Sequence, residues 1–136
     1  MGKVTITRMD SEHPDYYAVV GKLALDGDVA KGTLAPLTTE PGKSWWVAIV
    51  DGAVVGFCAA VPHGGSCTLK SMFVFADHRR QGIASQLFEA RWQWCQQLGA
   101  MNFKSVVTPE LVSTFRKYGF EVKSQRGKFS VMEFAS

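Results

Sequence analysis

Runs of apolar residues separated by turn residues predict most of the strands in this chain. Residues 44–50 and 53–61 form two such runs on either side of Asp51-Gly52, a dipeptide that favours a tight β-hairpin. A second turn at residues 62–65 leads into a third run at residues 66–75, which predicts a long strand. Shorter strands are expected at residues 3–8, 103–107, 120–124 and 129–134.

Helical spacing of apolar residues is clearest between residues 82 and 98. Gly99 provides a C-terminal stop for this helix, and its apolar face is expected to consist of Ile83, Leu87, Ala90, Trp94 and Leu98. A second amphipathic helix is expected at residues 13–25. A third begins at Pro109, with Thr108 as its N-terminal cap, and ends before Gly119.

The order of these elements predicts a mixed α+β fold. A strand and a helical region come first, and three antiparallel strands, a helix, a strand, another helix and two closing strands follow. Residues 26–42 are rich in Asp, Gly, Thr and Pro, so they predict a loop or a short helix. The strand–helix–strand passage in the middle is a crossover, expected to be right-handed. The length suits one domain, so we expect residues 1–136 to form a single domain.

Composition narrows the class of protein. Apolar residues make up 46% of the chain and charged residues 20%, as in ordinary soluble domains. No apolar run approaches the roughly 18–20 residues of a membrane span, and the N-terminus does not resemble a signal peptide. The three cysteines lack metal-ligand spacing, so we expect free buried thiols and no metal site. The sequence therefore predicts a cytoplasmic protein that does not associate with membranes.

A basic turn between the strand at residues 66–75 and the helix at residues 82–98 has the features of an anion site. The first N–H groups of a helix lack internal partners, and the helix dipole favours negative charge there. Gly82 and Ala84 carry little bulk, so a diphosphate can approach these amides closely. Arg79 and Arg80 add positive charge at the same place. The alternative interpretation is an ordinary surface turn, since no Walker-type Gly-Lys-Ser/Thr follows.

Two motifs in this order resemble the GNAT superfamily of N-acetyltransferases. The first is Arg-x-x-Gly-x-Ala at residues 79–84, and the second is Lys-x-Gly-Phe at residues 117–120. The resemblance is close over residues 66–120 and fits the element order over nearly the whole chain. It implies a central, twisted, mostly antiparallel sheet of about seven strands flanked by helices, with the cofactor at the β-α-β crossover.

The resemblance also implies acetyl-CoA as the cofactor. The backbone of the central strand would pair with the pantetheine arm where that strand parts from its neighbour. The amides of the basic turn and the helix start would hold the pyrophosphate. The cofactor-binding residues implied in this way are Met72, Phe73, Val74, Arg79, Arg80, Gln81, Gly82, Ile83, Ala84 and Ser85.

The positions of the catalytic acid and base depart from the family pattern. The tyrosine that protonates the leaving thiolate in many members is Phe115 here, which has no hydroxyl. Tyr118 is therefore the candidate acid, with packing as its alternative role. No carboxylate lies within residues 66–75, where the family base often stands, so His63 is the candidate base or water relay, with a surface turn histidine as the alternative. Glu110 is interpreted as a partner of the helix dipole.

The activity implied is direct transfer of an acetyl group from acetyl-CoA to a primary amine on a small molecule, peptide or protein. Asp26, Asp28 and Glu40 are candidate contacts for a cationic acceptor. One alternative is a CoA-binding regulatory module without turnover, which the loss of the tyrosine favours.

Another alternative is a nucleic-acid-modifying member of the same fold, favoured by the basic C-terminal third of the chain. The net charge of +3 suits a polyanionic cofactor and is too small to indicate nucleic-acid binding by itself. An exposed closing hairpin also predicts that two copies can pair edge to edge as a homodimer.

Overall fold

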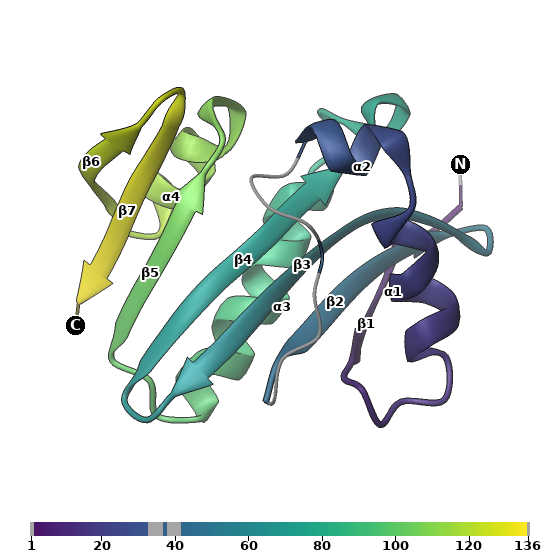
Figure 1. The fold of residues 1–136 in the computed structure, drawn as a ribbon, viewed down its shortest axis with the longest axis horizontal. Coiled ribbons are helices and arrows are strands. Elements are labelled where there is room, and N and C mark those ends of the chain that lie inside the picture. The colour runs from purple at the N-terminus through teal and green to yellow at the C-terminus, as the bar shows by residue number, and fades with distance from the viewer. Residues whose placement is uncertain (1, 33–36, 38–41, 136) are drawn as a thin grey trace.

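A seven-stranded sheet runs through the computed structural model, which describes residues 2–32, 37 and 42–135 (Figure 1). The strand order is β1-β2-β3-β4-β5-β7-β6, and every neighbouring pair is antiparallel except β4 and β5. The strands are β1 (Thr5–Met9), β2 (Ser44–Val50), β3 (Ala53–His63), β4 (Ser66–Val74), β5 (Asn102–Val107), β6 (Glu121–Arg126) and β7 (Phe129–Ala135).

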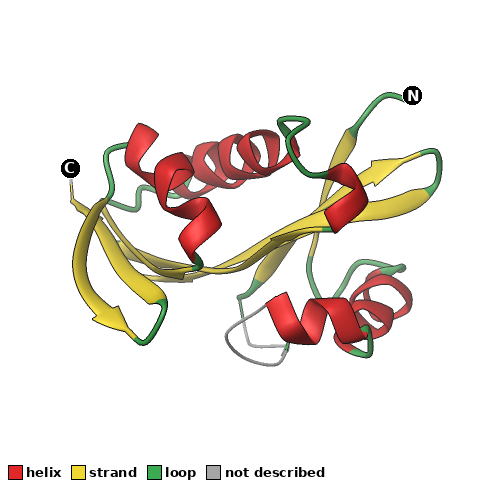
Figure 2. Cartoon of the chain, turned by 90° about the horizontal axis from the view of Figure 1, so that it is seen from above, coloured by secondary structure: helices red, strands yellow, loops and turns green. Residues whose placement is uncertain are grey.

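Helices cover both faces of this sheet (Figure 2). The helix α1 (Tyr16–Ala24) and the short α2 (Gly27–Gly32) lie on one face, and α3 (Ile83–Gln97) and α4 (Val112–Lys117) lie on the other. Two single turns of 3-10 helix, η1 (Ala76–His78) and η2 (Pro109–Leu111), precede α3 and α4. The predicted α+β fold with a mostly antiparallel sheet is confirmed, and none of the described helices is long and apolar enough to cross a membrane.

Coverage on both faces explains the apolar runs of the middle strands. Trp45 packs into the core under α1, while its neighbour Trp46 packs into the core under α3, because successive side chains of a strand point to opposite faces. Both indoles are buried, so they serve packing. The three cysteines are free and buried, as expected.

The buried face of α3 differs from the predicted one. The structure buries Ile83 and Leu87 as expected, but Leu98 is 53% exposed at the end of the helix. Residues four apart along the helix form the buried row, and Arg91 belongs to it. The prediction missed this row because a charged residue interrupts it. The remaining buried residues are Phe88, Trp92 and Cys95.

A β-bulge in β4 determines which of its side chains face α3. The β3–β4 pairing shifts between Phe57 and Ala59, and Ser71 adopts a left-handed backbone conformation with φ of 59°. One extra residue reverses the alternation of the strand. Leu69 faces α3 before the bulge, and Met72 faces it after the bulge, whereas Phe73 packs under α1.

Candidate active site

The parallel strands β4 and β5 part before either of them ends. Their pairing runs only from Ser66 opposite Asn102 to Leu69 opposite Ser105, and the Ser105 hydroxyl donates to the Leu69 carbonyl at 2.8 Å where the pairing stops. β4 continues to Val74, and Figure 1 shows the two strands diverging beyond this point. A parting of the central strand from its neighbour was expected from the sequence.

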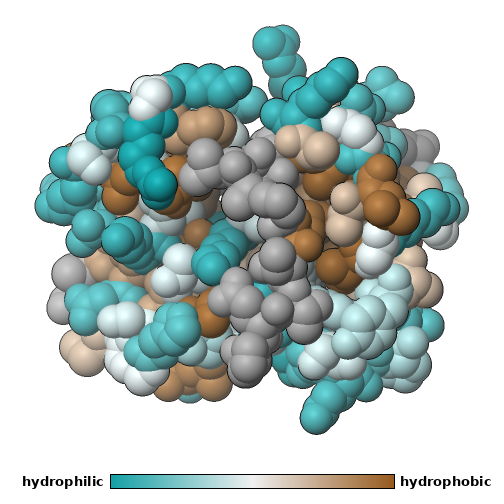
Figure 3. Space-filling model, in the orientation of Figure 1, coloured by the Kyte–Doolittle hydropathy of each residue, from teal (hydrophilic) through white to brown (hydrophobic). Residues whose placement is uncertain are grey.

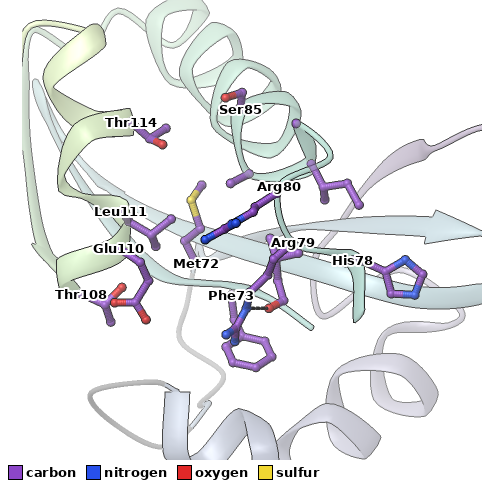
Figure 4. Close-up of a pocket in the computed structure, with 14 residues that line it drawn as sticks. Met72, Phe73, His78, Arg79, Arg80, Ser85, Thr108, Glu110, Leu111 and Thr114 are labelled. Atoms are coloured by element: carbon purple, nitrogen blue, oxygen red, sulfur yellow. Dashed lines mark hydrogen bonds between the residues drawn. The ribbon is translucent and has the colours of Figure 1, made fainter. Parts of the chain in front are cut away.

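A cavity of about 490 Å³ lies at this parting (Figure 4). This volume is in the range of small-molecule sites. The end of β4, the basic turn and the start of α3 form one wall, and η2 with α4 forms the other. Every residue named for cofactor binding lines this cavity except Gln81, which lies exposed in the turn.

The backbone of the basic turn leaves room for a ligand at the start of α3. Gly82 has φ of 79°, and a Cβ added there would meet nothing within 4 Å. Arg80 also has a left-handed conformation, with φ of 62°. None of the described side chains caps α3, so its first N–H groups remain available for an anion. The turn thus combines an open approach with unpaired amides.

The two arginines of the turn have different environments. Arg79 Nε donates to the Val74 carbonyl at 2.8 Å, and its guanidinium lies 5.5 Å from the centre of the Phe73 ring. Arg79 therefore ties the turn to the end of β4. Arg80 makes no hydrogen bond or ion pair with the described part of the chain, and its side chain extends across the cavity in Figure 4. Arg80 is the cation that a ligand can recruit.

The second wall of the cavity was not predicted. It consists of Thr108, Glu110, Leu111 and Thr114, which follow the carboxyl end of β5. Thr108 occupies the N-cap position before Pro109, as expected, but its side chain makes no capping hydrogen bond with the described residues. The signal that could have found the wall is topological, since ligands commonly bind beyond the carboxyl ends of parallel strands.

Tyr118, the candidate acid, does not line the cavity. Its hydroxyl donates to Glu89 Oε2 at 2.7 Å, and its ring stacks on Phe88 with the centroids 4.1 Å apart. Burial raises the pKa of Tyr118 to about 12, and the hydrogen bond to Glu89 acts in the same direction. The same bond holds the pKa of Glu89 below its usual range. The structure thus places this hydroxyl in a link between α3 and α4.

His63, the candidate base, lies at the other end of β4. It pairs with Ser66, and six residues of extended strand separate Ser66 from Met72, a span of about 20 Å. The structure therefore does not bring His63 to the cavity. The imidazole that does line the cavity is His78, on η1.

The candidate acceptor contacts are only partly described. Asp26 Oδ1 accepts hydrogen bonds from the backbone N–H groups of Asp28 and Val29, at 2.8 and 3.2 Å, and so caps α2. Asp28 is exposed in the first turn of this helix. Glu40 lies outside the described residues. Apolar residues are visible over the α1–α2 side in Figure 3, and Leu25, which follows α1, is 90% exposed.

Solved structures of N-acetyltransferases share this fold. PaiA N-acetyltransferase from Thermoplasma acidophilum, solved in complex with coenzyme A, superposes with a TM-score of 0.73 at 15% identity, over 98% of this chain and 99% of that one. The ribosomal-protein-S18-alanine N-acetyltransferase from Escherichia coli gives 0.75 at 14% identity, over 98% and 94%. An acyl-CoA N-acyltransferase from Pseudomonas aeruginosa gives 0.76 at 16% identity, over 98% and 100%.

The sequence comparison agrees with the fold. No curated protein sequence matches this chain significantly. The family profile described as an acetyltransferase (GNAT) domain, however, matches residues 41–122, which is more than half of the chain and includes β4, the basic turn and α3. The chain therefore belongs to the GNAT family of acetyltransferases.

Proposed function

We propose that this protein is an N-acetyltransferase that moves an acetyl group from acetyl-CoA to a primary amine by direct transfer. The observation that carries the proposal is the basic turn at the start of α3, which opens onto the cavity between the diverging strands β4 and β5. Open space at Gly82 and the unpaired cation of Arg80 fit a pyrophosphate.

Different residues of the cavity would bind different parts of the cofactor. Arg80 and the amides from Gly82 to Ser85 would hold the pyrophosphate. The backbone from Met72 to Val74, which has no strand partner on the β5 side, would pair with the pantetheine arm. When bound, acetyl-CoA supplies an acetyl thioester, whose carbonyl accepts a nucleophile.

The chain contributes mainly positioning to the transfer. The amine attacks as its neutral form, a C–N bond forms, the C–S bond breaks, and the electron pair leaves on the thiolate. A backbone N–H of β4 can polarise the thioester carbonyl, and holding the two reactants together removes much of the entropic barrier. Phe115 cannot protonate the thiolate, and the Tyr118 hydroxyl is bound to Glu89. The proton that the attacking nitrogen loses as the amide forms can pass to the thiolate directly or through water.

The acceptor is proposed as a primary amine on a small molecule, peptide or protein. The similar enzyme from Escherichia coli acts, by its name, on an alanine of a ribosomal protein. A CoA-binding module without turnover is the second candidate. It is favoured by the burial of Phe115 at 1% exposure and by the engagement of Tyr118 with Glu89.

Three further expectations are proposed with this function. One sheet takes its edge strands from both halves of the chain, which supports treating residues 1–136 as a single domain. Free thiols at all three cysteines are consistent with a reducing, cytoplasmic location. Edge-to-edge pairing of two copies would use β6 or β1, the strands at the two sheet edges.

Calorimetric titration of acetyl-CoA and free CoA tests the cofactor site. We expect stoichiometric binding to the wild type and loss of binding by at least tenfold in Gly82→Glu, because a carboxylate at that position repels the pyrophosphate. Gly127→Glu is the matched control, since Gly127 also has a left-handed conformation, with φ of 62°, and open space around its Cα. This control should bind CoA as the wild type does.

The same purified proteins separate the two candidate functions. Release of the CoA thiol in the presence of a panel of amines would support the transferase, and binding without release for any amine would support the module without turnover. Absence of CoA binding by the wild type would contradict both, and salt-dependent nucleic-acid binding would then be measured.

A further inference from the structure

Arg91 is a buried cation with no anionic partner in the described part of the chain. Its side chain on α3 is 0% exposed, and it forms no ion pair with a described carboxylate. Its Nε and Nη2 atoms are buried without a hydrogen-bond partner among the described residues. Burying an unpaired charge is costly, so the position requires an explanation.

The hydrogen bonds of Arg91 reach the bulge of β4. Its Nη1 donates to the Ala59 carbonyl at 3.2 Å and, in a longer bond, to the Lys70 carbonyl at 3.5 Å. Ala59 and Lys70 form the last regular pair before the bulge at Ser71. Arg91 therefore holds the strand at the point where its alternation reverses and Met72 turns toward the cavity.

The guanidinium also lies beside the residue that replaces the tyrosine of many family members. Its central carbon is 5.6 Å from the centre of the Phe115 ring and 5.3 Å from the centre of the Phe88 ring. Thr114, the neighbour of Phe115, lines the cavity. Lys70, whose carbonyl accepts from Arg91, precedes the cavity residue Met72 by two strand positions, a span of about 7 Å.

We propose that Arg91 is a positioning residue whose buried charge stabilises the thiolate that leaves from CoA. The proposal rests on the proposed function, which sets the pyrophosphate at Gly82 and runs the pantetheine arm from Val74 toward Met72. The thiol end of the arm then lies toward the bulge that Arg91 holds. A stabilised thiolate is a better leaving group, and this offsets the loss of a proton donor at Phe115.

The Cys58 thiol does not neutralise this charge. Burial raises the pKa of Cys58, on β3, to about 11, against the opposing effect of Arg91, so the thiol is neutral at physiological pH. Cys67, on β4, and Cys95, on α3, are buried with their sulfur atoms 3.1 Å apart. The hydrogen bond between them lowers the pKa of Cys67 and, together with burial, raises the pKa of Cys95. The field of Arg91 is therefore not cancelled by Cys58.

The other charged groups around the site act differently from Arg91. Arg79 and Arg80 lie at the turn, where the cofactor phosphates oppose their charge. Glu110 lines the cavity, and its negative charge would destabilise a thiolate. Glu89 is bound to Tyr118 outside the cavity.

Lys70, next to the bulge, is the remaining cation, and it belongs to the opposite face of the strand from Leu69. It therefore provides a control for any cation near the bulge.

The experiment measures the ionisation of the bound CoA thiol by NMR, with CoA that carries 13C at the carbon next to sulfur. A unit charge about 10 Å away inside a protein shifts an ionisation by roughly one pH unit. We expect the thiol of CoA bound to the wild type to have a pKa about one unit below that of free CoA. Arg91→Gln, which keeps a donor for the carbonyls but loses the charge, should abolish this difference.

Arg91→Lys and Lys70→Gln complete the test. Arg91→Lys keeps the charge, so the bound thiol should keep its lowered pKa. For Arg91→Gln we expect a roughly tenfold loss in transfer rate, and Arg91→Lys should lose less than this. Lys70→Gln should leave the thiol pKa unchanged. The proposal is overturned if the wild type and Arg91→Gln give the same thiol pKa, or if Lys70→Gln or Arg91→Lys raises it as much as Arg91→Gln.

The same measurements distinguish failure of the Arg91 proposal from failure of the proposed function on which it rests. If CoA does not bind to the wild type, the proposed function fails and the inference fails with it. If CoA binds with an unshifted thiol pKa, only the role of Arg91 fails.

Discussion

At the scale of single residues, polar side chains in this protein work through one or two specific partners. Arg79 fastens the basic turn to the Val74 carbonyl, and Asp26 caps α2. Ser105 closes the end of the β4–β5 pairing through its bond to Leu69. Each such bond contributes about 1 kcal/mol net. The hydroxyl of Tyr118 belongs to this group, although its place in the sequence suggested catalysis.

Tyr118→Phe removes the hydroxyl that donates to Glu89 and keeps the ring that stacks on Phe88. We expect the free energy of unfolding to fall by about 1 kcal/mol at neutral pH, while acetyl transfer stays within about twofold of the wild type. Urea denaturation and a thiol-release assay measure the two quantities. A rate loss of tenfold or more with unchanged CoA binding would instead restore Tyr118 as the acid.

The stabilisation by Tyr118 should depend on pH. The folded protein raises the pKa of Tyr118 to about 12, above the value of about 10 for an unfolded chain. The contribution is therefore complete below pH 10 and is lost as the pH rises toward 12. The folded protein also lowers the pKa of Glu89. The stabilisation by the Tyr118–Glu89 hydrogen bond is therefore also lost as the pH falls through the pKa of Glu89 in the folded protein. The difference in the free energy of unfolding between the wild type and Tyr118→Phe should become smaller at high pH and at low pH. A difference that grows above pH 10 would contradict this account.

At the scale of elements, the bulge of β4 is the feature that builds the site. It reverses the alternation of the strand, so that Met72 rather than Ser71 joins the core with α3 and lines the cavity. A left-handed conformation at a non-glycine residue costs about 1 kcal/mol, which the surrounding pairing and the bond from Arg91 must offset.

Ser71→Val tests the strain at the bulge. A β-branched residue fits a left-handed conformation poorly, so we expect the substitution to lower the free energy of unfolding by about 1–2 kcal/mol. Thr68→Val, at a regularly paired position of the same strand, is the control and should cost less than about 0.5 kcal/mol. Equal losses from the two substitutions, measured by urea denaturation, would mean that the bulge carries no special strain. Ser71→Gly should be nearly neutral, because relief of strain and the added freedom of the unfolded chain oppose each other.

At the scale of the whole molecule, the sheet separates two hydrophobic cores. One lies under α1 and α2, and the other joins α3 and α4 to the sheet. The cavity lies on the side of the sheet that α3 and α4 cover, where the strands β4 and β5 diverge. A ligand in the cavity would bridge β4, α3 and η2, because all three contribute lining residues.

CoA should therefore stabilise the folded protein as a whole. At a concentration one hundred times its dissociation constant, a ligand adds about 2.7 kcal/mol, which corresponds to a rise of roughly 10 °C in Tm for a chain of this size. Thermal unfolding with and without CoA measures the rise, and hydrogen exchange locates it. Protection should increase in β4, the basic turn and the start of α3, and should change least in β6. No rise for the wild type, or an equal rise for Gly82→Glu, would contradict the assigned site.

Local features of the fold could be predicted from the sequence. Asp51 and Gly52 have φ of 49° and 78°, as the predicted hairpin requires, and the edges of β2 agree with the prediction. The basic turn, the start of α3 at Ile83 and the resemblance to GNAT enzymes were also determined by the sequence. These features depend on backbone preferences and periodicity within a few neighbouring residues, which a single chain reveals directly.

Tertiary structure alone decided which side chains meet. The sequence places His63 near the central strand, yet pairing with Ser66 puts it at the far end from the cavity. It shows no sign that Thr108 and Glu110 form a cavity wall, or that Arg91 is buried under the bulge. Such meetings depend on strand register, on the bulge and on the rotation of α3, and each of these is set by many contacts between residues far apart in the chain.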